Sequence, residues 1–329
     1  MLTVFFFILG LAILTGGAEF LVRGASQFSR RLGVAPLIVG LTVVAFGTSA
    51  PELAVSVKSA LAGQADIALG NVLGSNILNI LLILGLSALI VPLTISRQLV
   101  QVDLFVMIGS AVLAWLFALD GSISRIEGLI LFAGIFCYLA FQFKLAKANK
   151  ALADSLIEEG TEKPLPAKLS AYVFDFIIAT VGLIMLVYGA NMMVNSAVII
   201  ARNLGISELV IGLTIVAVGT SMPEVAASLM ASLRGERDLA VGNIVGSNIF
   251  NILAVLGPTA AISKSGIGVS PSALQFDFPF MLLVSFICLP IFFTGKEITR
   301  KEGALLLACY IAYTVILILI ATGRAVLPW

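Results

Sequence analysis

Histidine is absent from this chain of 329 residues, and only 11% of its residues are charged. Without histidine there is no Ser-His-Asp triad, no histidine-ligated zinc site and no imidazole proton relay. A soluble domain averages about 25% charged residues, so the low charge argues against a water-soluble enzyme. The three cysteines, Cys137, Cys288 and Cys309, are odd in number and lie in apolar runs, so we expect packing residues and no disulfide framework.

Charge of one dominant sign is also lacking, since 19 basic and 18 acidic residues leave a net charge of +1. No Lys- or Arg-rich run with interleaved aromatic residues is present, so nucleic acid is not an expected partner. The sequence has no H-E-x-x-H motif and no nucleophile with an adjacent base. We therefore expect neither an enzyme nor a bound cofactor.

Hydrophobic residues dominate what is present: they make up 60% of the chain, and the mean hydropathy is +1.13. A membrane-crossing helix needs about 20 mostly apolar residues, and such stretches recur with little interruption. The first stretch has no Lys or Arg before it and no A-x-A cleavage pattern, so we expect a span and not a signal peptide. The expected fold class is an all-α membrane protein with ten transmembrane helices, near residues 2–22, 34–61, 67–93, 101–119, 126–147, 171–200, 206–233, 239–263, 275–294 and 302–322.

One long polar segment that contains proline divides the chain. It predicts a first unit at 1–147, a linker at 148–170 and a second unit at 171–329. If the linker is cytoplasmic, 14 of the 19 Lys and Arg residues lie on that side. Because cytoplasmic loops are enriched in Lys and Arg, we expect both termini outside the cytoplasm.

The two units are copies of one another. A shift of 172 positions aligns Gly40–Gly85 with Gly212–Gly257 without a gap, and 27 of the 46 pairs are identical. Each unit has five expected spans, and because five is odd the second copy must cross the membrane in the opposite sense. Inverted repeats of this kind are a transporter architecture, with substrate bound near the midplane on helices broken at corresponding positions, here helices 2 and 7.

Proline marks those positions, in the motifs Gly47-Thr48-Ser49-Ala50-Pro51-Glu52 and Gly219-Thr220-Ser221-Met222-Pro223-Glu224. Proline has no amide hydrogen for the carbonyl four residues earlier, so each helix should break and leave carbonyl oxygens free. A glutamate inside a span costs about 2.5 to 3.5 kcal/mol on insertion scales, which favours cation binding by Glu52 and Glu224. The alternative is a pair of helix capping boxes, Ser49-x-x-Glu52 and Ser221-x-x-Glu224.

A second polar motif, Gly-Asn-x-x-Gly-Ser-Asn-Ile, follows in each unit at 70–77 and 242–249. Helical spacing places three polar residues of each copy on one stripe: Asn71, Ser75 and Asn79, and Asn243, Ser247 and Asn251. The glycines allow close helix packing. The polar side chains suit either cation ligation or hydrogen bonds between membrane helices, and both interpretations stay open at this point.

Oxygen is the only kind of ligand atom that these motifs offer. Carboxylate, carbonyl, hydroxyl and amide oxygens suit Ca²⁺ or Na⁺, whereas transition metals favour thiolate or imidazole. Calcium takes about 6 to 8 oxygens. The two glutamates and the freed carbonyls near Thr48 and Thr220 could supply most of them. One Ca²⁺ or two monovalent cations would neutralise the two carboxylates, which suggests exchange of one for the other.

With these motifs the sequence resembles the sodium/calcium exchanger family of the calcium/cation antiporter superfamily, in its compact prokaryotic form. The resemblance implies a secondary antiporter that exchanges Ca²⁺ for Na⁺, with Glu52 and Glu224 as ligands for both ions. The other ligands that it implies are the backbone carbonyls of Thr48 and Thr220 for calcium, Ala45, Thr48, Ser49 and Ser247 with Glu224 for one sodium ion, Ala217, Thr220, Ser221 and Ser75 with Glu52 for another, and Asn79 and Asn251 at the middle position.

One position departs from part of the family. Potassium-dependent members and some prokaryotic ones hold an aspartate where this chain has Asn251. The resemblance therefore implies K⁺-independent exchange, which is electrogenic if more than two Na⁺ move per Ca²⁺. It also implies that spans 2–22 and 171–200 move across the core, that a monomer suffices for transport, and that the linker holds no regulatory calcium-binding domain.

Two other functions stay open. A Ca²⁺/H⁺ antiporter has the same fold, but those relatives generally carry a glutamate after the Gly-Asn motif, where Gly74-Ser75 and Gly246-Ser247 stand here. A passive cation channel lined by the two broken helices would show flux without coupling. In each case the expected partners are cations and the lipid bilayer, in the plasma (inner) membrane.

Overall fold

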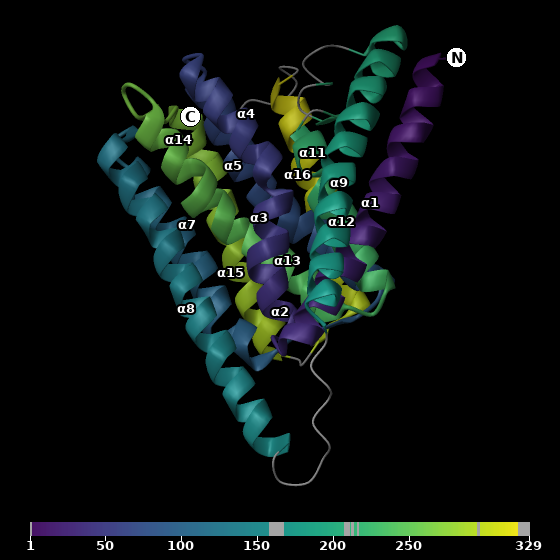
Figure 1. The fold of residues 1–329 in the computed structure, drawn as a ribbon. Helices are drawn as coiled ribbons and strands as arrows, with labels where there is room; N and C mark the ends of the chain where they lie inside the picture. Colours follow the sequence, from purple (N-terminus) through teal and green to yellow (C-terminus); the bar gives the residue numbers. More distant parts are fainter. Residues whose placement is uncertain are drawn as a thin grey trace.

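The protein is a bundle of long helices, described by a computed structural model at residues 2–157, 168–206, 211, 214, 215, 217–294 and 297–321 (Figure 1). Segments labelled η are π-helical. The helices are α1 (Leu2–Leu32), α2 (Pro36–Val39), η1 (Gly40–Val44), α3 (Ala45–Thr48), α4 (Ala50–Leu61), α5 (Ala65–Leu78), η2 (Asn79–Leu84), α6 (Gly85–Ile90), η3 (Leu99–Asp103), α7 (Leu104–Ala118), α8 (Arg125–Ile157), α9 (Leu169–Asn203), α11 (Ala217–Thr220), α12 (Met222–Leu233), α13 (Arg237–Phe250), η5 (Asn251–Leu256), α14 (Gly257–Ile262), η6 (Ala273–Asp277), α15 (Phe278–Thr294) and α16 (Arg300–Ala321).

Within the described residues, eight helical stretches are long and apolar enough to cross a membrane, and a bent pair makes a ninth. The protein is therefore an all-α membrane protein. The predicted span at 206–233 includes residues outside the described part, so the count of ten stays a prediction. In the predicted linker, α8 continues to Ile157 and α9 begins at Leu169, while 158–167 lie outside the described residues.

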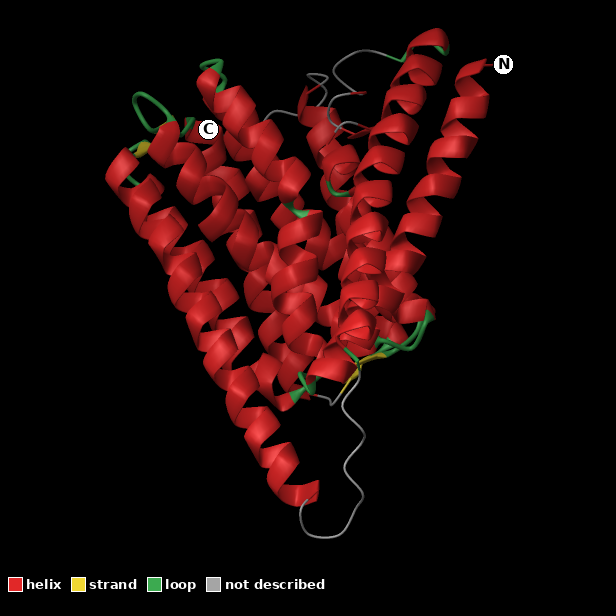
Figure 2. Cartoon of the chain, in the orientation of Figure 1, coloured by secondary structure: helices red, strands yellow, loops and turns green. Residues whose placement is uncertain are grey.

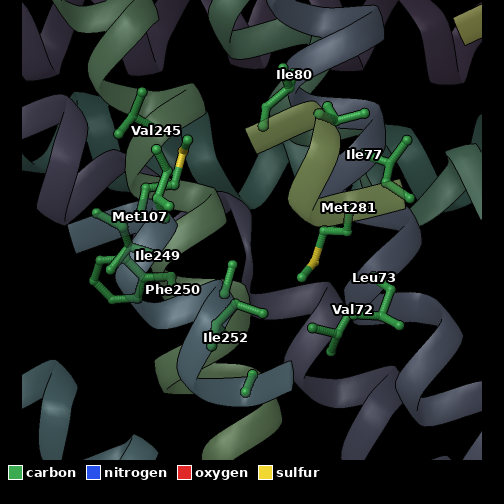
Figure 3. Packing of buried hydrophobic residues seen from close by; sticks show 14 of the residues in the cluster. Val72, Leu73, Ile77, Ile80, Met107, Val245, Ile249, Phe250, Ile252 and Met281 are labelled. Carbon is green, nitrogen blue, oxygen red and sulfur yellow. The ribbon is translucent and has the colours of Figure 1, made fainter. Parts of the chain in front are cut away.

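Two stretches form the centre of the bundle, Ala65–Ile90 (α5, η2 and α6) and Arg237–Ile262 (α13, η5 and α14). In their most apolar parts 72% and 94% of residues are buried, against 17% in α16. Apolar side chains from both stretches and from flanking helices meet there. Figure 3 shows Ile77 and Met281 in one part of this cluster, and Met107 and Ile249 in another. Most side chains on the central stretches are therefore shielded from lipid and water.

Two small antiparallel sheets join loops of the two units. β1 (Leu93–Thr94) pairs with β4 (Glu297–Ile298), with Leu93 opposite Ile298, and β2 (Ser122–Ile123) pairs with β3 (Ile267–Gly268), with Ile123 opposite Ile267. Figure 2 shows the two sheets at opposite ends of the bundle. Each sheet therefore ties one unit to the other at a different end.

Helices α1 and α9 lie side by side with their backbones in contact (Figure 1). Glycines face the partner helix at intervals of one or two turns. A Cβ atom added to Gly17 would lie 2.6 Å from the Leu186 nitrogen, and one added to Gly182 would lie 2.3 Å from the Leu21 nitrogen. A side chain at either position would overlap the backbone of the partner helix, so only glycine fits. Small residues of this kind allow membrane helices to approach closely.

We expect Gly182→Val to destabilise the bundle, because its Cβ would overlap the backbone of α1. Overpacking of this kind costs about 1 to 3 kcal/mol or more. The measurement is the melting temperature of the purified protein in detergent. Gly109→Val in α7 is the control, since no described atom lies within 4 Å of a Cβ added there. Equal melting temperatures for the two variants would contradict the close packing of α1 on α9.

Candidate cation site

Both Pro-Glu motifs lie where a helix ends and a new one begins. Helix α3 ends at Thr48 and α4 starts at Ala50, with a 42° bend between Pro36–Thr48 and Ala50–Leu61. Ser49 between them has φ −83° and ψ 4°, and its copy Ser221 has φ −88° and ψ 6°. Each Thr-Ser-x-Pro sequence ends in proline, and proline has no amide hydrogen to donate to the carbonyl four residues earlier. The helix therefore breaks at this point.

The two glutamates are held by serines from the opposite unit. Ser221 Oγ donates a hydrogen bond of 2.8 Å to Glu52 Oε1, and Ser49 Oγ donates one of 3.0 Å to Glu224 Oε1. Glu52 is 0% exposed and Glu224 is 1% exposed. The exchange of bonds across the units brings both carboxylates into one buried site.

This geometry excludes the capping boxes. Ser49 and Ser221 occupy the N-cap positions of α4 and α12, but neither side chain makes a capping hydrogen bond. A capping box needs the serine hydroxyl on the backbone of its own helix. Because the hydroxyls bond to the other unit's glutamate instead, the Ser-x-x-Glu spacing that both motifs share does not cap the helix.

A chain of side chains holds each break in place. Thr48 Oγ1 donates to Asn243 Oδ1 over 3.2 Å, and Asn243 Nδ2 donates to Ser228 Oγ over 2.9 Å. The other half has the same chain with the same two distances, through Thr220, Asn71 and Ser56. The threonine hydroxyls are therefore engaged, which leaves their backbone carbonyls as the oxygens for a cation. Asn71 and Asn243 act as helix-to-helix hydrogen-bonding residues, the interpretation that the sequence left open.

Several buried polar atoms near the breaks have no hydrogen-bond partner among the described residues. They are Glu52 Oε2, Glu224 Oε2, Asn79 Oδ1, Asn251 Oδ1 and Nδ2, and Ser247 Oγ. The ion pairs of the described part, such as Arg31–Asp175, do not involve either glutamate. Buried polar groups are normally satisfied, and an unpaired buried charge is strongly unfavourable. Six orphaned atoms, five of them oxygens, therefore suit a cation.

The remaining predicted ligands lie on the elements around the glutamates. Ser75 Oγ lies 3.0 Å from Ser221 Oγ, within hydrogen-bond distance, so Ser75 belongs to the group around Glu52. Asn79 Nδ2 donates to Asn248 Oδ1 over 3.2 Å and so joins the two central stretches. The others are placed as follows: Ala45, Ser247 and Asn251 are buried, Thr220 is half-buried at the end of α11, and the side chain of Ala217 lies outside the described part. Helix α4 contacts η5, which begins at Asn251.

The chemistry of the site is that of a hard cation. Among the described residues, no group of three or more His, Cys, Asp or Glu side chains comes together. Two carboxylates, two threonine carbonyls and neutral hydroxyl and amide oxygens match the ligands of Ca²⁺ or Na⁺ and lack the thiolate or imidazole that transition metals favour. The candidate ligands lie at the breaks of membrane-spanning helices, which is where transporters built on inverted repeats bind their substrates.

Comparisons with known proteins agree with this geometry. The family model described as sodium/calcium exchanger protein matches residues 2–144 and 174–319. The inner membrane protein YrbG of Escherichia coli (strain K12) is 42% identical over 282 residues, which are 85% of each chain. The sodium/calcium exchanger MaX1 of Methanosarcina acetivorans is 33% identical over 350 residues, covering 96% of this chain and 99% of that protein.

Solved structures are similar as well. The sodium-calcium exchanger NCX_Mj, soaked with 2.5 mM Na⁺ and 1 mM Sr²⁺, matches with a TM-score of 0.81 and 31% identity over 96% of this chain and 98% of that one. Fold and site thus define a multi-pass membrane transporter of the antiporter class. The chain belongs to the sodium/calcium exchanger family, in its compact prokaryotic form.

We expect Ser49→Ala and Ser221→Ala to lower the stability of the ion-free protein by similar amounts, because the two bonds are reciprocal. A hydrogen bond to a charged group contributes about 1.5 to 3 kcal/mol. The measurement is the melting temperature in detergent without Ca²⁺ and Na⁺. Ser285→Ala is the control, because that buried hydroxyl donates only to Met281 O of its own helix, over 2.8 Å. A control that melts as early as the site variants would contradict the role of the reciprocal bonds.

Proposed function

We propose that this chain is a secondary active antiporter that exchanges Ca²⁺ for Na⁺, electrogenically, without K⁺ and without a cofactor. The observation that carries the proposal is the pair of fully buried glutamates, one from each unit, whose second carboxylate oxygens have no partner among the described residues. Membership of the sodium/calcium exchanger family and the names of MaX1 and NCX_Mj support the choice of ions.

Charge explains why such a site exchanges ions. Glu52 and Glu224 together carry two negative charges in a buried site. One Ca²⁺ or two Na⁺ neutralise them, whereas an empty site would leave two buried charges uncompensated, which is strongly unfavourable. The loaded protein therefore changes conformation more easily than the empty one, and the two ions compete for the same carboxylates. A further Na⁺ on the neutral flanking oxygens makes the exchange electrogenic.

The proposed ligands follow the grouping of the side chains. Glu52 and Glu224 bind both ions, and the carbonyls of Thr48 and Thr220 complete the calcium shell. The flanking sodium sites are formed by Ala45, Thr48, Ser49 and Ser247 with Glu224, and by Ala217, Thr220, Ser221 and Ser75 with Glu52, while Asn79 and Asn251 lie at the middle position. The bonds from Ser49 to Glu224 and from Ser221 to Glu52, and the contact between Ser221 and Ser75, support this grouping.

The architecture that we propose is ten spans in two inverted repeats of five. The 27 identities in 46 aligned pairs support it. So do the two small sheets, because β1 and β3 follow corresponding helices, as do β2 and β4, and the pairs β1–β4 and β2–β3 lie at opposite ends (Figure 2). The proposed orientation has the linker in the cytoplasm and both termini outside, in the plasma membrane, with a monomer as the transporting unit.

The test is uptake of radioactive calcium by proteoliposomes loaded with Na⁺ and diluted into Na⁺-free buffer, with a proton ionophore present. We expect rapid uptake by the wild type. Glu52→Gln and Glu224→Gln should reduce it to the background of empty liposomes, because each leaves a single carboxylate for a divalent ion. Glu127→Gln, a half-buried glutamate at the start of α8 whose carboxylate bonds Ser124 and lies away from the site, is the matched control and should retain uptake.

Three results would contradict the proposal in different ways. Uptake driven by a pH gradient with Na⁺ irrelevant would indicate a Ca²⁺/H⁺ antiporter at the same site. Calcium flux without any opposing gradient would indicate a passive channel. Uptake that survives both glutamine variants would mean that the ions bind elsewhere.

Potassium gives a second test. We expect wild-type uptake to be the same with and without K⁺, because Asn251 contributes a neutral amide and the site holds two carboxylates. Asn251→Asp adds a third negative charge, which needs an additional monovalent cation for neutrality. Uptake by this variant should therefore rise when K⁺ is added. Stimulation of the wild type by K⁺ would contradict the proposed independence.

A further inference from the structure

The two central helices differ sharply in how far they are covered. Ile67 near the start of α5 is 52% exposed, whereas its copy Leu239 on α13 is 1% exposed. A Cβ added to Gly242 would lie 2.7 Å from Leu37 O of α2, so α2 and η1 close that face of α13. The corresponding face of α5, at Gly70, is exposed. Among the described residues, α5 is therefore more exposed along this face than α13, while the second unit's copy of α2 and η1, at 208–216, lies largely outside them.

A cavity of about 430 Å³ occupies that open face. Among the described residues it is lined by α4, α5, α11, η6 and α16. It runs from Ile67 to Ser75, eight residues further along α5, a distance of about 12 Å at 1.5 Å per residue. Its inner end includes Thr220 and Ser75, both predicted ligands. The cavity therefore connects one end of the bundle with the group around Glu52.

One acidic side chain lines this cavity, Asp277 on η6, and its copy in the first unit has a different environment. Asp103 is fully buried, and its carboxylate accepts hydrogen bonds from Tyr138 over 3.1 Å and from Gln142 over 2.5 Å. Both acids are the fifth residue of their helical stretch, past the first turn where a helix N-terminus favours acids. A favourable interaction with the helix N-terminus therefore does not account for these two acids.

The second unit lacks the amide donor, Gln142, that bonds to Asp103 in the first unit. When Tyr313 is aligned with Tyr138, Leu317 takes the position of Gln142, and Leu317 lines the cavity. Tyr313, the copy of Tyr138, has its ring stacked on Phe280, with centroids 4.6 Å apart and planes 5° from parallel. Asp277 is thus half-buried among largely apolar walls and lacks the amide donor of its copy. A carboxylate in such a place is unfavourable unless a cation is near.

We propose that Asp277 recruits the transported cation: its carboxylate is the first negative charge that a cation meets in the cavity leading to Ser75 and Thr220. This inference rests on the proposed function for the identity of the cation. A low-dielectric cavity with one charge focuses the field and raises the local concentration of the opposite ion. Asp277 acts on the rate of access and does not form part of the central shell, whereas Asp103 is fully buried and bonded to Tyr138 and Gln142.

A cysteine in the cavity measures this field directly. Thr314 lines the cavity, so Thr314→Cys is placed in a chain whose Cys137, Cys288 and Cys309 are alanine. Membrane-impermeant methanethiosulfonates of opposite charge are added to sealed proteoliposomes. We expect the cationic reagent to react roughly tenfold faster than the anionic one, and the ratio to fall severalfold with Asp277→Asn. Asp66→Asn is the control, an exposed acid in the first turn of α5 that does not line the cavity, and should leave the ratio unchanged.

Transport in the chain with its native cysteines provides an independent readout. Asp277→Asn should raise the KM for calcium about three- to tenfold at low ionic strength with little change in the maximal rate, and high salt should reduce the difference. An Asp277→Asn variant equal to Asp66→Asn in both assays would overturn the inference, as would a Thr314→Cys thiol that neither reagent reaches. If the wild type reacts as expected but shows no exchange, the cation cavity stands and the proposed exchange function fails.

Discussion

Two buried carboxylates without a protein counter-charge constrain the rest of the structure. Glu52 and Glu224 each receive a single hydrogen bond from a serine of the other unit, and each keeps an oxygen without a described partner. A buried pair of this kind is unfavourable unless protons or cations neutralise it, and the proposed function assigns cations to the site. The proline breaks, which free carbonyl oxygens, and the Thr-Asn-Ser chains, which hold the breaks in position, both provide for that occupancy.

The positions of the breaks and of the glutamates could be predicted from the sequence, because they depend on local chemistry. Pro51 lacks an amide hydrogen in any structural context. Glu52 has apolar residues on both sides within one span, so its burial is expected as well. The pairing of each serine with a glutamate could not be predicted in the same way. Ser49 and Ser221 have the same neighbours in sequence, and their bonds cross between units 172 positions apart, so residue spacing alone does not assign them.

Copies of one motif also acquire different roles through packing that the motif does not contain. Asn71 and Asn243 looked equally suited to ions and to helix contacts, and the partners Thr220 and Thr48 decided the matter. Asp103 and Asp277 differ because the first unit has Gln142 where the second has Leu317. Tertiary neighbours, not local pattern, distinguish these pairs.

The same asymmetry bears on the balance between access states. Helices α1 and α9 pack as one unit, and ion pairs tie α1 to the helices beside the core, from Glu19 to Arg234 and from Arg30 to Glu236. Any transition that slides α1 along α12 must break both pairs. Exposed pairs contribute about 0 to 1 kcal/mol each, so together they change the ratio of two states severalfold. The copies of Glu19 and Arg234 are Asn191 and Ala62, which cannot form such a pair. An inverted repeat with identical ends would give two access states of equal energy, so in the proposed transport cycle the unmatched pair Glu19–Arg234 would make the two states unequal without any change in the ion ligands.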